Sequence, residues 1–307
     1  MTYDEAMERI PERELPEWWV GDLETMHGHL GRLRPADMQE IAVSPGGRSI
    51  VAVAYGEPEP TPRDANFNSA IGAQVPSAYV DRAAREKPVV LLVGPVHGHE
   101  VEGLTGLVNL VSVIETGGDL AGTERPHLQE LARACRVLII PAGNPDGIAR
   151  FVPRSLQGME RVDLRWWGQG AWTDGTLIGW RPSKTVHPMT ADRVRFLGCY
   201  FDDDGVNPAH DEFFAPMGPE APAILDLARD EAPDIAALLH SHESVPAFIR
   251  PKYVPLETQA EVVQLAERTW ALYDEAGLEH GNLWEATAEG GEYPPALNLT
   301  SAVYHVS

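Results

Sequence analysis

Two short apolar runs, each followed closely by histidine, place the strongest constraint on the fold of this chain. The first, VVLLV at 89–93, ends at Gly94-Pro95, and the second, DIAALL at 234–239, ends directly at His240. Short runs of this kind, bounded by turn residues, predict strands that are fully buried. Buried strands that alternate with helices favour a largely parallel sheet covered by helices.

The same alternation continues through most of the 307 residues. Further strands are predicted at 38–43, 48–56, 136–140 and 246–250, and helices at 100–115, 126–135, 219–231 and 255–276. Residues 144–215 show a weaker pattern, which predicts long loops beside the functional site. We therefore expect a helical segment over 1–35, followed over 36–307 by a single α/β domain with a mixed, largely parallel central sheet flanked by helices.

The charge of the chain excludes some classes of partner. It has 24 basic and 46 acidic residues, a net charge of −22, which would repel a nucleic-acid backbone or an anionic membrane. Two cysteines form no disulfide framework, the N-terminus has no apolar signal segment, and no apolar run approaches the ~20 residues of a membrane span. These features predict a cytoplasmic protein.

Polar side chains follow both buried strands. His97, His99 and Glu100 come after the first strand, and His240 follows the second. Because ligands bind beyond the carboxyl ends of strands in open α/β sheets, both histidine clusters lie where a site is expected. Two imidazoles and a carboxylate can hold a catalytic zinc ion and leave one position open. Taken alone, an HxxE pair is a weak signal that is common on protein surfaces, and a histidine at the end of an apolar strand is often simply a partly buried histidine; only the two clusters together make a metal site as plausible as ordinary histidines.

Three motifs together resemble the metallocarboxypeptidase family, which includes the succinylglutamate desuccinylase and aspartoacylase branch. They are PVHGHEVEG at 95–103, IIPAGNPDG at 139–147 and DIAALLHSHES at 234–244. The resemblance implies that His97, Glu100 and His240 bind Zn²⁺, with His242 beyond them as a substrate-binding residue. It also implies a zinc-dependent hydrolase that cleaves a peptide or amide bond with metal-activated water. The alternatives are an N-acyl amino acid or amide deacylase of the same fold, and a metal-binding but catalytically impaired interaction module.

The resemblance also implies an arginine that stabilises the developing oxyanion. Arg150, Arg154, Arg161 and Arg165 lie in the matching segment, and we assign the role to Arg154. The family binds a substrate carboxylate through an Asn-Arg pair. Asn207 matches the asparagine, but Pro208 follows it in place of the arginine. We therefore expect a peptide or small amide substrate whose recognition differs from that of ordinary carboxypeptidases.

The general base departs from the family pattern. The family's catalytic glutamate follows a segment similar to ALNLTSAVYHVS, which here occupies 296–307. Its counterpart is therefore expected just past Ser307, in a longer protein from which this chain is truncated. Glu243 as a substitute base, or metal binding without efficient catalysis, remains an alternative. Glu285, Glu289 and Glu292 do not match by position.

Overall fold

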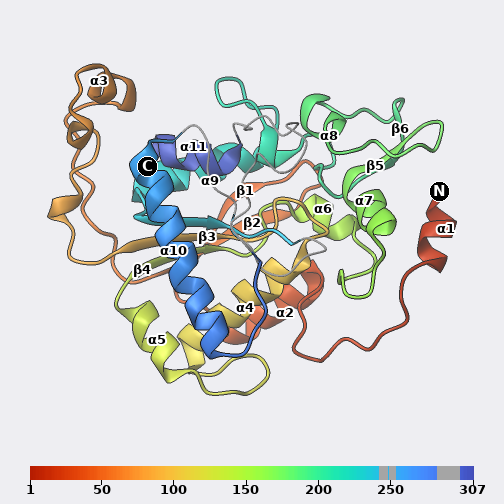
Figure 1. Ribbon diagram of the computed structural model, residues 1–307, viewed down its shortest axis with the longest axis horizontal. Helices are drawn as coiled ribbons and strands as arrows, with labels where there is room; N and C mark the ends of the chain where they lie inside the picture. The colour runs from red at the N-terminus through yellow and green to blue at the C-terminus, as the bar shows by residue number, and fades with distance from the viewer. Residues whose placement is uncertain (242–247, 249–253, 282–297) are drawn as a thin grey trace.

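The computed structural model describes residues 1–241, 248, 254–281 and 298–307. At its centre lies a five-stranded sheet in the order β1-β2-β4-β3-β7 (Figure 1). Strand β3 runs parallel to both β4 and β7, whereas β2 pairs antiparallel with β1 and β4. The five strands are β1 (Met38–Val43), β2 (Ser49–Tyr55), β3 (Val89–Val93), β4 (Arg136–Ile140) and β7 (Ile235–Leu238). The predicted mixed sheet is confirmed, but β7 is partly exposed, with Ile235 at 40%, so the expectation of a fully buried strand at 234–239 is wrong: β7 lies at the end of the strand order and, within the described residues, pairs with β3 alone.

Helices cover the sheet on both faces (Figure 1). The longer ones are α2 (Leu23–Leu33), α4 (Val101–Thr116), α5 (Pro126–Arg133), α7 (Arg161–Gln169), α9 (Glu220–Glu231), α10 (Leu256–Glu275) and α11 (Leu299–Val306). The shorter ones are α1 (Tyr3–Glu8), α3 (Phe67–Gly72), α6 (Pro145–Arg150), α8 (Pro182–Thr185) and the 3₁₀ turns η1 (Pro76–Ala78), η2 (Arg82–Ala84) and η3 (Pro208–His210).

Successive side chains of one strand enter two different cores. Val51 and Val53 of β2 pack in a cluster with side chains of α2, α4 and α5, whereas Ile50 and Ala52 pack in a second cluster with α9 and α11. This is the two-residue alternation expected of a strand. It fixes the strand register, because a slip of one residue would exchange the two faces. The sheet is therefore a rigid platform for the loops that leave its edge.

The segment 144–215 is more ordered than its sequence pattern predicts. It contains α6, α7, α8 and η3, and a two-stranded antiparallel sheet of β5 (Gly170–Trp172) and β6 (Val194–Leu197). Its core is aromatic: the buried Trp166 ring stacks on Phe196 at 4.1 Å between centroids. Because each element is short, no element spans enough turns or alternations to give a periodic signal. The segment therefore consists of structured loops with short helices and strands between them.

The N-terminal residues pack into the same body. Helices α1 and α2 both lie within the predicted helical segment, and Met26 and Leu30 of α2 belong to the cluster that contains α4. The strand predicted at 246–250 lies, apart from residue 248, outside the described residues. Among the described residues, no helix combines the length and apolar character needed to cross a bilayer.

Candidate metal centre

The parallel strands β3 and β7 deliver the two halves of the site to one edge of the sheet. Val93, the last residue of β3, is paired with Leu238, the last residue of β7. The chain then reaches His97 and Glu100 after one strand and His240 after the other. Residues 140 positions apart therefore meet because two neighbouring strands end together.

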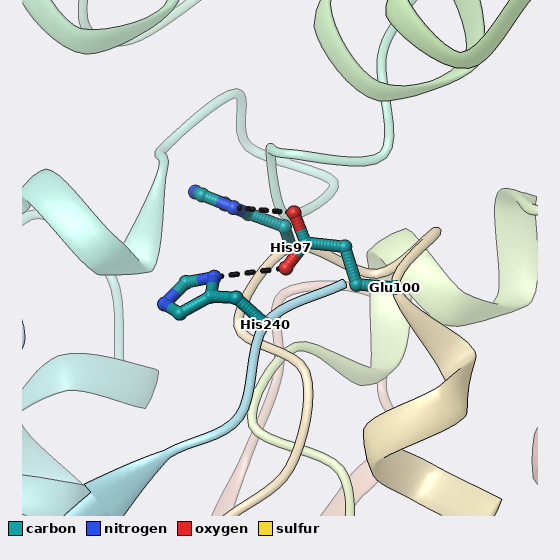
Figure 2. A group of neighbouring side chains, drawn as sticks. All are labelled: His97, Glu100 and His240. Carbon is teal, nitrogen blue, oxygen red and sulfur yellow. Dashed lines mark hydrogen bonds and ion pairs between the residues drawn. The ribbon is translucent and has the colours of Figure 1, made fainter. Parts of the chain in front are cut away.

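The Glu100 carboxylate lies between the two imidazoles (Figure 2). Its Oε1 lies 3.1 Å from Nδ1 of His97, and its Oε2 lies 2.8 Å from Nδ1 of His240. The two rings are 4.9 Å apart between centroids. One donor atom from each residue lies within 4.8 Å of the others. Within the described part of the chain, no other group of three such residues meets this criterion.

Burial and charge favour the protonation states that bind metal. Burial alone would raise the pKa of Glu100, but the adjacent His97 and His240 lower it far below its ordinary value. Burial lowers the pKa of His97, which keeps that imidazole neutral. Nε2 of His97 is buried without a hydrogen-bond partner in the described structure. An ionised carboxylate that faces the Nδ1 atoms of two imidazoles is a donor set that fits a zinc ion.

The histidine loop is held by close backbone contacts. Gly98 donates its N–H to the carbonyl of Cys199 at 2.7 Å, and a Cβ at this position would collide with the backbone of Gly147. The Asn144 amide accepts from Gly147 N–H at 2.8 Å and donates to the carbonyl of Val96 at 3.2 Å. The HGHE and NPDG segments are thus joined. Only glycine at position 98 allows the backbones of the two segments to come this close.

A small hollow opens beside the metal-binding group. Tyr200 forms one of its walls and stacks on the His97 ring at 3.8 Å between centroids. The other lining residues are His99, Leu156, Leu164, Arg165, Gln169 and Ser241. Ser241 directly follows His240, so the hollow adjoins the metal ligands. It combines an arginine with apolar side chains, as binding sites for small polar groups do.

Comparison with known proteins identifies the family. The sequence profile described as zinc carboxypeptidase matches residues 28–196, which include His97 and Glu100.

The chain belongs to the zinc carboxypeptidase family.

No curated protein matches it. Among solved structures it is similar to the carboxypeptidase A of Helicoverpa armigera, with 12% identity and a TM-score of 0.51 over 97% of this chain and 66% of that one. It is also similar to thrombin-activatable fibrinolysis inhibitor, with 11% identity and a TM-score of 0.55 over 99% and 70%. The bovine form of that protein, in complex with a tick carboxypeptidase inhibitor, is similar at 10% identity, with a TM-score of 0.50 over 92% of this chain and 80% of that one. At such identities these likenesses show the fold alone. The chain spans just under two thirds of the length of the Helicoverpa carboxypeptidase.

Of the site residues predicted from the sequence of this family member, some meet at the metal centre and others do not. His97, Glu100 and His240 come together as described above. Arg154 does not join them in any described contact: its guanidinium pairs with Asp22, its carbonyl accepts from Trp19, and its side chain is 52% exposed. His242 lies outside the described residues, as do Glu243, Glu285, Glu289 and Glu292.

Asn207 is fully buried, and both ends of its amide bind backbone. Its Nδ2 donates to the carbonyl of Ser183 at 3.0 Å, and its Oδ1 accepts from Ala209 N–H at 3.1 Å. The side chain therefore joins α8 to η3. Because Asn207 is fully buried, a contact with substrate would require the residues that cover it to move.

Sequence patterns did not single out Tyr200 or Lys184, and left Arg165 as one of four candidates. Tyr200 stacks on a metal ligand, Arg165 lines the adjoining hollow, and the charge of Lys184 lowers the pKa of His97. All three lie in the segment 144–215, whose elements were not predicted. No spacing rule connects these residues to the ligands, because the contacts depend on how α7, α8 and their loops fold over the sheet edge.

Proposed function

We propose that this protein is a zinc-dependent hydrolase that cleaves a peptide bond in the manner of a carboxypeptidase-like metallopeptidase. One observation carries the proposal: Glu100 is held between His97 and His240 at the edge of the sheet, next to a hollow lined by Arg165. The family match supports peptides as the substrate class.

His97, Glu100 and His240 are the proposed ligands of Zn²⁺. When bound, zinc polarises the scissile carbonyl and lowers the pKa of an attacking water molecule to about 7. The side chains do the positioning. The Glu100 carboxylate brings the two imidazoles together at the position the ion would occupy, and Tyr200 supports the plane of the His97 ring. His97 and Glu100 are buried, which strengthens electrostatic interactions between them, whereas His240 is exposed on the open side of the site.

Arg165 is better placed than Arg154 to stabilise the developing oxyanion. It shares the hollow with Ser241 and Tyr200, and its charge acts on the Tyr200 hydroxyl. The assignment of this role to Arg154, made from the sequence, remains a proposal. The ion pair of Arg154 with Asp22 argues against it. Removing one donor of an oxyanion site typically lowers kcat by ~10²–10³. We expect Arg165→Ala to lose this amount, and Arg154→Ala to lose less than tenfold.

Substrate contacts by Asn207 and His242, and a general base beyond Ser307, also remain proposals. Hydrolysis of a small N-acyl amino acid or amide is the second substrate class to test. A cytoplasmic location is proposed from the acidic composition and from the free thiols of Cys135 and Cys199.

The experiment is a hydrolysis assay of the zinc-loaded protein, extended to its natural length where the gene encodes more, against blocked dipeptides and N-acetyl amino acids. We expect release of the C-terminal residue from the dipeptides, and its loss in His97→Ala and His240→Ala. His127→Ala, which changes an exposed histidine of α5, is the matched control. Hydrolysis that is unchanged in both ligand variants, or no hydrolysis by the natural-length protein, would contradict the proposal.

A further inference from the structure

We propose that Asp202 and Glu220 form a second cation site, separate from the zinc centre, that takes a hard divalent ion of the calcium class. Asp202 opens the run of three aspartates at 202–204, and Glu220 is the first residue of α9. Neither residue belongs to the group formed by His97, Glu100 and His240. The proposal therefore does not depend on the proposed hydrolase activity.

The two carboxylates are completely buried and largely without hydrogen bonds. Asp202 and Glu220 are each 0% exposed. Oδ2 of Asp202 and both oxygens of Glu220 have no partner among the described residues. Removing a carboxylate from water is costly unless hydrogen bonds or a counter-charge replace the water. This pair therefore requires either bound protons or a cation.

The unpartnered oxygens of the two residues meet beside Gly218. A Cβ at this position would lie 2.9 Å from Oε2 of Glu220 and 3.0 Å from Oδ2 of Asp202. Because both oxygens lie so close to one point, a single ion can be shared between them. Glycine at this position keeps a side chain from separating the two carboxylates.

Calcium fits a buried pair of carboxylates better than magnesium does. Calcium accepts carboxylates, backbone carbonyls and water in a flexible arrangement, with oxygens at about 2.3–2.6 Å. Magnesium requires a nearly ideal octahedron and gives up its water reluctantly. A divalent ion would also balance the two negative charges of Asp202 and Glu220.

Backbone groups fix the position of both side chains. Val206 donates its N–H to Oδ1 of Asp202 at 2.8 Å, which orients this carboxylate and leaves Oδ2 for another partner. Asp211 accepts from the N–H groups of Met217 and Gly218 at 3.0 Å, and so orders the turn just before α9. The oxygens are therefore held in place before an ion arrives, as a binding site requires.

The charges around Glu220 favour a cation. Those that act most strongly on it belong to Asp202, Asp146 and Asp211, all of which are acids. The nearby guanidinium of Arg48 pairs with Asp146 at 2.8 Å. Within the described part of the chain, no basic side chain pairs with Asp202 or Glu220. An ion would supply the positive charge that these residues lack.

Protons compete with the ion for this pair. In the ion-free protein, burial raises the pKa of Glu220 to about 8 and that of Asp202 to about 6. Glu220 is then protonated at neutral pH, and an ion that binds must displace its proton. We therefore expect calcium to bind more tightly at pH 9 than at pH 6, by at least about tenfold.

The test is calorimetric titration of calcium at pH 9 into zinc-loaded protein in calcium-free buffer. We expect one calcium ion per chain. Glu220→Gln and Asp202→Asn each remove one charge with little change of shape, and each should weaken binding at least tenfold. Glu257→Gln and Asp226→Asn, which remove exposed charges, should leave it unchanged. These two controls measure any weak attraction of calcium to a chain of net charge −22.

Thermal unfolding provides a second readout, because an ion that binds only the folded state stabilises it. Excess calcium should raise the Tm of the wild-type protein by at least about 3 °C and that of Glu220→Gln by less than about 1 °C. His240→Ala lacks a proposed zinc ligand but should keep the full calcium shift, since the two sites are separate.

The contrary outcomes are distinct. Calcium affinity that is unchanged in Glu220→Gln, in a variant with wild-type circular dichroism, overturns the site. So does the absence of calcium binding at pH 9, which would mean that the two acids hold protons only. Loss of the calcium shift in His240→Ala would place the ion at the zinc centre and also overturn the site. An equal shift with magnesium would overturn the assignment to calcium.

Discussion

Gly98 shows how one missing side chain allows the metal-binding loop to form. A Cβ at this position would collide with the backbone of Gly147, which cannot move without displacing the NPDG segment. We expect Gly98→Ala to lower the free energy of unfolding by about 2–4 kcal/mol, because the clash involves backbone on both sides. Denaturant unfolding followed by circular dichroism measures this change.

The matched control is Gly106→Ala, in the exposed face of α4. A Cβ there meets nothing within 4 Å, and alanine favours a helix interior over glycine by about 0.5–1 kcal/mol. We therefore expect Gly106→Ala to stabilise the protein slightly. Equal effects of the two substitutions would show that the loop does not depend on this close approach.

Glu220, at the start of α9, predicts a pH dependence of stability. Burial, and then the charge of Asp202, raises its pKa from the ordinary 4.5 to about 8. The folded state thus holds a proton that the unfolded state releases between these values, so stability falls as pH rises from about 4.5 to about 8. Glu220→Gln should remove this loss. The free energy of unfolding of the variant, compared with that of the wild type, should therefore be at least about 2 kcal/mol more favourable at pH 9 than at pH 5.

The comparison is Glu257→Gln, which changes an exposed glutamate in the first turn of α10. Thermal unfolding at pH 5, 7 and 9 should show no pH-dependent gain for that variant. A wild-type protein whose stability rises between pH 5 and pH 9, with Glu220→Gln running parallel to it, would contradict the assigned protonation of Glu220.

At the scale of elements, Asp146 connects the start of α6 to two distant loops. Its carboxylate accepts from the Ser44 hydroxyl at 2.5 Å and from the Asp203 N–H at 3.0 Å, and it pairs with Arg48 at 2.8 Å. Burial opposes ionisation, but these bonds keep its pKa below the ordinary value. The connection joins the β1–β2 turn to the segment that packs against the histidine loop.

Replacing this carboxylate tests the connection. We expect Asp146→Asn to lower the free energy of unfolding by about 3 kcal/mol at pH 7, because Arg48 loses a buried partner. Since the pKa is lowered, the difference from wild type should shrink as pH falls below about 4. Asp226→Asn, in an exposed pair with Arg229, should cost less than about 1 kcal/mol. Equal losses in both variants would mean that Asp146 does not connect the loops.

The elements that could be predicted are those whose own sequence contains the signal. Strands β3 and β4 and helix α4 are apolar enough, and long enough, to be recognised by periodicity, and their predicted bounds lie within one residue of the structure. Helices α7 and α8 have too few turns for such a signal. Their positions depend on packing, as in the stacking of Trp166 on Phe196, which only the folded chain displays.

At the scale of the whole molecule, the same distinction separates the predicted metal ligands from the rest of the site. His97, Glu100 and His240 could be found because each follows a recognisable apolar strand and parallel strands end at a common edge. Arg165 and Tyr200 could not, since they reach the centre from a segment outside the sheet. The choice of Arg154 over Arg165 shows this limit: both have suitable chemistry, and only the fold separates their surroundings.

The central claim is that one zinc ion is bound jointly by residues from two strand ends 140 positions apart. The direct measurement is metal content by mass spectrometry after purification in zinc-containing buffer and gel filtration. We predict one zinc per wild-type chain and per His127→Ala chain, and less than about a tenth as much in His97→Ala and His240→Ala, which each lose a nitrogen that binds the ion. Zinc retained in full by either ligand variant, or absent from the wild-type protein, would contradict the account.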